Sequence, residues 1–159
     1  MLTSLQRLIG MPVVLRDCRI GFVERAFADP SLRRLEGVVI RRGLGSARWL
    51  RGSQILLAGR TCLLADGTPA RMPRIADETV RHAYLVTGEY AGVVSDVVLD
   101  AETLLAGALE ISRSPSGRLM GQCMYTAQYS AASCKENVTA GELLTWPQLR
   151  KLLGEEDRT

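Results

Sequence analysis

Few residues in this sequence are of the types that perform chemistry, and their spacing assembles no recognisable site. The single histidine, His82, has no cysteine near it and is expected at the surface or at a domain boundary. Zinc sites and disulfide frameworks need closely spaced ligands or a pattern of paired cysteines. We therefore predict no metal, no cofactor and free thiols at all four cysteines, Cys18, Cys62, Cys123 and Cys134.

Serine, aspartate and glycine also occur without a catalytic arrangement. Neither Ser114 nor Ser116 lies in a nucleophile-elbow pattern. Gly43-Leu44-Gly45 lacks the lysine and the further glycine of a phosphate loop, so it predicts a hairpin turn. Asp29 and Asp100 are each expected to accept hydrogen bonds from the backbone of the turn that follows. The sequence thus predicts no catalytic residue and a protein that is not an enzyme.

Arginine is the one residue type that is both abundant and unevenly placed. It supplies 18 of the 20 basic residues. Residues 1–81 hold 14 arginines and 7 acidic residues, a charge of +7, whereas residues 82–159 hold 6 basic and 10 acidic residues, a charge of −4. Such asymmetry indicates a partner-binding face, two halves that attract each other, or a solvated surface. Six arginines are expected on turns and strand ends of the first half: Arg33, Arg34, Arg41, Arg42, Arg48 and Arg51.

Guanidinium groups bind both carboxylates and phosphates, so these six arginines have two alternative partners. RNA readers usually interleave stacking aromatic residues with basic ones, and Trp49 is the one candidate in this region. An acidic protein surface is therefore favoured over nucleic acid. Tyr125 and Tyr129 predict either a contact loop, because tyrosine is enriched at interfaces, or a plain additional hairpin of the sheet.

Length and composition describe a globular protein of one domain or two very small ones. The chain has 159 residues, of which 47% are hydrophobic, and a net charge of +3. Disordered chains are less apolar and more strongly charged. A membrane span is not predicted, because the chain has no uncharged apolar run of about 18 residues. We expect a cytoplasmic location.

An internal repeat organises the chain. Gly21–Ile40 aligns with Gly92–Ile111 at an offset of 71 residues, and glycine, apolar and aspartate positions agree in order. Each copy reads as a strand, a tight turn and a second strand. About six short strands in roughly 65 residues favour a small closed barrel, since closure removes exposed edges.

Three segments lie outside the aligned repeat. Residues 67–80 contain Pro69 and Pro73 and are expected to form a linker or an extended arm. Gln54-Ile55 matches Gln148-Leu149 at a larger offset, so residues from about 112 to 142 are predicted to be an insertion. A short C-terminal helix is expected after Thr145 as N-cap, with Pro147 in its first turn and a buried stripe of Leu149, Leu152 and Leu153.

Both copies resemble a known family. Leu8–Val13, Gly21–Glu24, the Asp29-Pro30 turn and the strand Leu35–Ile40 are similar to a PRC-barrel domain, although the late segment Leu50–Ile55 lacks the expected proline. That family includes barrels of the photosynthetic reaction-centre H subunit and of the ribosome-maturation factor, and small stand-alone bacterial proteins. The resemblance implies an adaptor that binds proteins without catalysis.

These observations together predict a mainly all-β fold with two tandem small PRC-like β-barrels and short helices, including the one at the C-terminus. The first barrel is expected over residues 1–66 and the second over residues 81–159, without a clear final pair of strands. We expect a protein-interaction module whose partner the sequence does not name, with a homodimer as one such association. The alternative is an RNA- or ribosome-associated factor that uses the arginine-rich first barrel.

Overall fold

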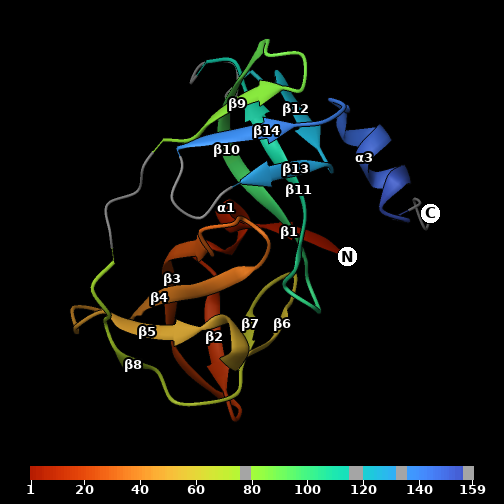
Figure 1. The fold of residues 1–159 in the computed structure, drawn as a ribbon. Helices are drawn as coiled ribbons and strands as arrows, with labels where there is room; N and C mark the ends of the chain where they lie inside the picture. Colours follow the sequence, from red (N-terminus) through yellow and green to blue (C-terminus); the bar gives the residue numbers. More distant parts are fainter. Residues whose placement is uncertain (76–79, 115–119, 132–135, 156–159) are drawn as a thin grey trace. The chain divides into compact units, whose positions relative to one another are not determined.

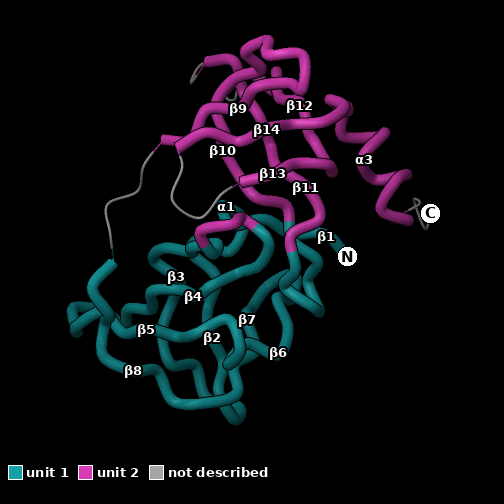
Figure 2. Tube along the Cα trace, viewed as in Figure 1, with its two compact units in different colours: residues 1–29, 33–77, 99–105 teal, residues 30–32, 78–98, 106–159 magenta. Residues whose placement is uncertain are grey.

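The structure is a computed structural model, and it describes residues 1–75, 80–114, 120–131 and 136–155. It confirms the expected fold class: two curled sheets of short strands with short helices, one of them near the C-terminus (Figure 1). The chain forms two compact units (Figure 2). Unit 1 comprises residues 1–29, 33–77 and 99–105, and unit 2 comprises residues 30–32, 78–98 and 106–159.

The sheet of unit 1 has the strand order β6-β7-β2-β3-β4-β5-β8. β7 runs parallel to β2, and the other neighbouring pairs are antiparallel. Val13, Val38, Leu50 and Leu63 are among its fully buried side chains. Its strands are β2 (Pro12–Leu15), β3 (Cys18–Ala28), β4 (Leu35–Arg41), β5 (Arg48–Arg51), β6 (Ile55–Ala58), β7 (Leu63–Ala65) and β8 (Ala70–Arg71).

Three short pieces complete unit 1. A 3-10 turn, η1 (Gly52–Gln54), joins β5 to β6, and β1 (Leu2–Ser4) leads into the one-turn helix α1 (Leu5–Leu8). The Ser4 hydroxyl accepts a hydrogen bond from the Arg7 N–H, as an N-cap does. β8 lies within residues 67–80, so part of the segment expected to be a linker or an extended arm pairs with β5.

The sheet of unit 2 has the strand order β12-β11-β10-β9-β14-β13. β14 runs parallel to β9. Among the described residues, no helix of either unit is long and apolar enough to span a bilayer. The strands are β9 (His82–Leu85), β10 (Tyr90–Asp100), β11 (Ala106–Ser112), β12 (Cys123–Thr126), β13 (Tyr129–Ala131) and β14 (Asn137–Ala140).

The two sheets repeat the same strand pairings, which corrects the predicted insertion. β14 pairs in parallel with β9 as β7 does with β2, and β12 pairs with β11 as β5 does with β4. The strands within residues 123–140 are therefore the counterparts of β5, β6 and β7. The match of Gln54-Ile55 with Gln148-Leu149 was wrong, because Ile55 begins strand β6 whereas Leu149 lies in a helix that follows the last strand of the second sheet. The second copy thus has its own late strands, although their sequence does not align visibly with that of the first copy.

Two glycines show the repeat at atomic detail. Gly21 has φ +154° and Gly92 has φ +140°, and each adjoins a register shift between the first two strands of its copy. A Cβ added at Gly21 would lie 2.8 Å from the Arg41 carbonyl oxygen, and one at Gly92 would lie 2.5 Å from the Ser112 carbonyl oxygen. Because Arg41 and Ser112 are also 71 residues apart, the same close backbone approach is built twice.

The aspartates of the two turns cap backbone N–H groups as predicted. The Asp29 carboxylate accepts hydrogen bonds from the Arg33 N–H at 2.7 Å and the Arg34 N–H at 3.0 Å. In the second copy, Asp100 accepts from the Glu102 and Thr103 N–H groups. The pKa of Asp100 is lowered, chiefly by the hydrogen bond from the Thr103 N–H. Burial acts in the opposite direction but has a smaller effect on this pKa. Both aspartates therefore have a structural role.

The C-terminal helix α3 (Trp146–Leu152) begins after Thr145, whose N–H donates to the Gln148 side chain at 2.9 Å. Leu149 is fully buried, as predicted. The expectation for Leu152 was wrong, because its side chain is 62% exposed. Leu153, the residue after the helix, is half-buried, so the buried stripe is narrower than the three leucines predicted.

Candidate functional site

The structure divides the six candidate arginines between the two ends of one sheet. Arg33 and Arg34 precede β4, and Arg51 ends β5 opposite Gly37, near the start of β4. The other three, Arg41, Arg42 and Arg48, surround the β4–β5 turn at the far end of β4. The seven residues of β4 separate Arg33 and Arg34 from Arg42 by roughly 20 Å, whereas Arg51 lies roughly 10 Å from Arg48 along β5. The arginines are therefore spread along β4 and β5.

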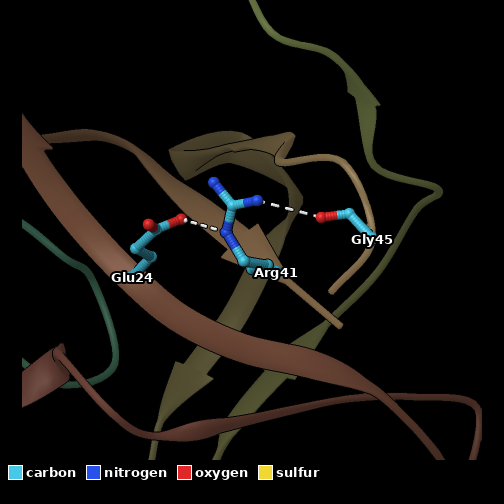
Figure 3. A network of polar contacts seen from close by, with 3 residues as sticks. All are labelled: Glu24, Arg41 and Gly45. Atoms are coloured by element: carbon cyan, nitrogen blue, oxygen red, sulfur yellow. Dashed lines mark hydrogen bonds and ion pairs between the residues drawn. The ribbon is translucent and has the colours of Figure 1, made fainter. Parts of the chain in front are cut away.

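Arg41 holds the β4–β5 turn in place. Its guanidinium Nε lies 2.9 Å from the Glu24 carboxylate on β3, and a terminal nitrogen donates to the Gly45 carbonyl at 2.9 Å (Figure 3). The turn is closed by a hydrogen bond from the Gly45 N–H to the Arg42 carbonyl at 3.0 Å. Gly43-Leu44-Gly45 thus forms the hairpin turn that the sequence predicts. The Arg41 guanidinium is therefore already used within the protein, in its contacts with Glu24 and Gly45.

A further arginine joins this end of the sheet. Arg71 on β8 lies directly opposite Arg48 on β5. We call Arg42, Arg48 and Arg71 the arginine edge; all three are exposed. Sequence reasoning missed Arg71 because it lies in the segment expected to be a linker. The available signal was a basic residue between Pro69 and Pro73, which favour extended backbone.

Tyr129 does not fit the predicted role as a partner contact. Its side chain is only 7% exposed, and its hydroxyl donates a hydrogen bond to the Leu32 carbonyl within unit 2. β13 and β12 are not paired with each other but lie at opposite ends of the strand order. Both are regular strands of the sheet, so Tyr129 belongs to the framework of unit 2.

Tyr125 is half-buried and packs inside the same unit. Its ring centroid lies 5.1 Å from that of Trp146, and its hydroxyl donates to the Glu110 carboxylate at 3.2 Å. Ser95 donates to the other carboxylate oxygen of Glu110 at 2.8 Å. Burial, and then the charge of Glu110, raise the pKa of Tyr125 to about 12. These contacts make a polar cluster that stabilises the β10–β11–β12 surface.

The raised pKa of Tyr125 predicts a loss of stability in alkali. The folded protein keeps this phenol protonated to about pH 12, whereas the unfolded chain releases the proton near the model value of 10.0. The stabilisation is therefore fully present below pH 10.0 and is lost as the pH rises toward about 12. Urea unfolding at about pH 9 and about pH 11 measures the loss. Tyr125→Phe should reduce it, and an equal loss in both proteins would contradict the assignment.

Unit 2 also carries an exposed aromatic surface that the sequence did not single out. Side chains alternate along a strand, so His82 and Tyr84 leave β9 on the same face, and Tyr84 is paired across the strands with Tyr90. The tyrosine rings are 5.4 Å apart, and the His82 Nδ1 lies 3.0 Å from the Tyr90 hydroxyl. Tyr84 is 38% exposed and Tyr90 is 47% exposed. We call His82, Tyr84 and Tyr90 the aromatic face.

The remaining chemical candidates stay separate. Cys18 is exposed, Cys62 and Cys123 are half-buried, and these three are free thiols; Cys134 lies outside the described residues, as does Ser116. Among residues 1–75, 80–114, 120–131 and 136–155, no three His, Cys, Asp or Glu side chains come together as metal ligands would. No model of a known protein family matches the chain, and no curated protein matches it significantly.

Proposed function

We propose that this chain is a non-enzymatic protein-interaction module of the PRC-barrel type that acts as an adaptor in the cytoplasm. The observation that carries the proposal is the aromatic face, where two exposed tyrosines contact each other and Tyr90 contacts the half-buried His82. Tyrosine is enriched in protein interfaces because it offers a large apolar ring with a polar tip. The resemblance of both repeats to PRC barrels supports the same role.

The neighbouring side chains on this face also suit a protein partner. Asn137 and Thr139 on β14 are paired with His82 and Tyr84, and both are exposed. An interface usually combines an apolar centre with a polar rim that can make hydrogen bonds. The aromatic rings would supply the centre, and the amide and hydroxyl groups would supply the rim. Self-association through such a surface remains a prediction of the same proposal.

Site-specific photo-cross-linking in cells tests the proposal. A photoreactive phenylalanine analogue placed at Tyr84 should give a discrete adduct with another protein. Tyr90→Ser in the same chain should weaken that adduct, because it removes the neighbouring ring. The matched control carries the analogue at Leu152, which is also exposed and in unit 2 but lies on α3. Equal adducts from both positions, or none from Tyr84, would contradict the proposal.

A further inference from the structure

We propose that the arginine edge, together with Leu44, binds an acidic segment of a partner protein that also carries an apolar side chain. This inference rests on the proposed function and names the chemistry of one partner. It concerns a different surface from the aromatic face, so the two can be tested separately. The argument depends on the placement of charges, on the shape of the turn and on the way the nearby tryptophan is packed.

The charges of the arginine edge are close together and uncompensated. Directly opposite residues on neighbouring antiparallel strands have Cβ atoms about 5 Å apart, and like charges in such positions repel each other. Arg48 and Arg71 occupy such a pair. Within the described residues, none of the three guanidinium groups of the arginine edge forms an ion pair. A carboxylate-bearing ligand would relieve the repulsion and gain charge-assisted hydrogen bonds.

The turn presents an apolar side chain beside these charges. Leu44 is fully exposed at the tip of the β4–β5 turn. Gly43 on its flank has φ +55°, and an added Cβ there would meet nothing within 4 Å, so the approach to the turn is open. The contacts of Arg41 with Glu24 and Gly45 order the turn in advance, which reduces the entropy lost on binding. An acidic segment with an apolar residue can therefore contact Leu44 and the arginines together.

The packing of Trp49 favours an acidic protein over RNA. Its ring centroid lies 6.0 Å from that of Phe27, and the Arg25 guanidinium covers the Phe27 ring at 4.7 Å. The ring also fills the space beside Gly37 that a Cβ would occupy. Sequence-tolerant RNA binding relies on aromatic rings that are free to stack on bases. The only tryptophan of unit 1 is instead used for packing.

The test measures fluorescence anisotropy of a labelled peptide made of glutamates around a central leucine, with the full-length protein. We expect the double variant Arg48→Glu/Arg71→Glu to bind at least about tenfold more weakly, because both central charges are reversed. Leu44→Ser should weaken binding about fivefold, through the apolar contact alone. Raising the ionic strength from about 0.02 M to about 0.3 M should weaken binding of the native protein.

Two controls separate this effect from overall charge and from misfolding. Arg60→Glu makes the same charge change as Arg71→Glu alone, but in the β6–β7 loop, which lies at the opposite end of the strands because β7 runs in the same direction as β4. It should leave binding within about twofold of the native protein. Arg71→Glu alone places opposite charges across β5 and β8, so its thermal midpoint should not fall although its binding weakens.

Three results would overturn the inference. The first is an equal loss of peptide binding in Arg60→Glu, and the second is binding that does not respond to salt. The third is tighter binding of oligouridylate or of phosphatidylserine vesicles than of the peptide, with the same dependence on Arg48 and Arg71. If the protein does not bind the peptide but still forms the Tyr84 adduct, this inference is refuted and the proposed function is retained. The opposite pair of results would refute the aromatic face and retain the arginine edge.

Discussion

Gly92→Ala is expected to lower the free energy of unfolding of unit 2 by about 3 kcal/mol or more. Two costs add at this position. The φ of +140° is one that side chains rarely adopt, and the new Cβ would lie 2.5 Å from the Ser112 carbonyl oxygen. Since that oxygen belongs to the backbone of β11, relief of the contact requires two hydrogen-bonded strands to move apart.

The chain offers a matched control for the conformational part of this cost. Gly88 has φ +88°, but an added Cβ there would meet nothing within 4 Å. Gly88→Ala should therefore cost only about 1 kcal/mol, from the left-handed backbone alone. Urea unfolding followed by the fluorescence of Trp146, in a Trp49→Phe background that leaves one tryptophan, reports on unit 2. Equal costs at Gly88 and Gly92 would show that the close approach is not important.

Gly21→Ala tests whether the glycine of the first copy contributes as much to stability as the equivalent Gly92 of the second copy. Its Cβ would meet the Arg41 carbonyl oxygen at 2.8 Å, a slightly longer contact than the one at Gly92. We expect a comparable loss of stability in unit 1, followed by the fluorescence of Trp49 in a Trp146→Phe background.

Leu149→Ala is expected to cost about 2–4 kcal/mol, because truncation of a fully buried leucine removes its packing and leaves a cavity. Leu149 is the one fully buried residue of α3, and the helix packs on β12. The attachment of α3 to the sheet should therefore depend largely on the Leu149 side chain. Urea unfolding followed by the fluorescence of Trp146, the first residue of the helix, measures the loss.

Leu152→Ala is the control for that experiment. The Leu152 side chain is 62% exposed, so its truncation should change the stability by no more than about 0.5 kcal/mol. A similar loss from both substitutions would mean that the helix buries the broader stripe of leucines that its sequence pattern indicates.

The candidate site could be read from the sequence only in part. Arginines are visible as a charge excess in residues 1–81, but the end of a strand at which each lies depends on the turns. The length of β4 separates Arg33 from Arg42, and pairing of β8 with β5 brings in Arg71. The aromatic face was missed because Tyr84 and Tyr90 are ordinary strand residues until the β9–β10 register places them side by side.

The sequence by itself determined the repeated strand–turn–strand unit, its glycines and aspartates, and the start of the C-terminal helix. Those features are local, since a positive φ, a capped turn or an N-cap depends on residues a few positions apart. The tertiary structure decided that β12, β13 and β14 are the late strands of the second sheet, that Tyr129 is buried, and that Leu152 is not. Each of these depends on pairing between segments far apart in the chain, for which alternating apolar residues give no unique partner.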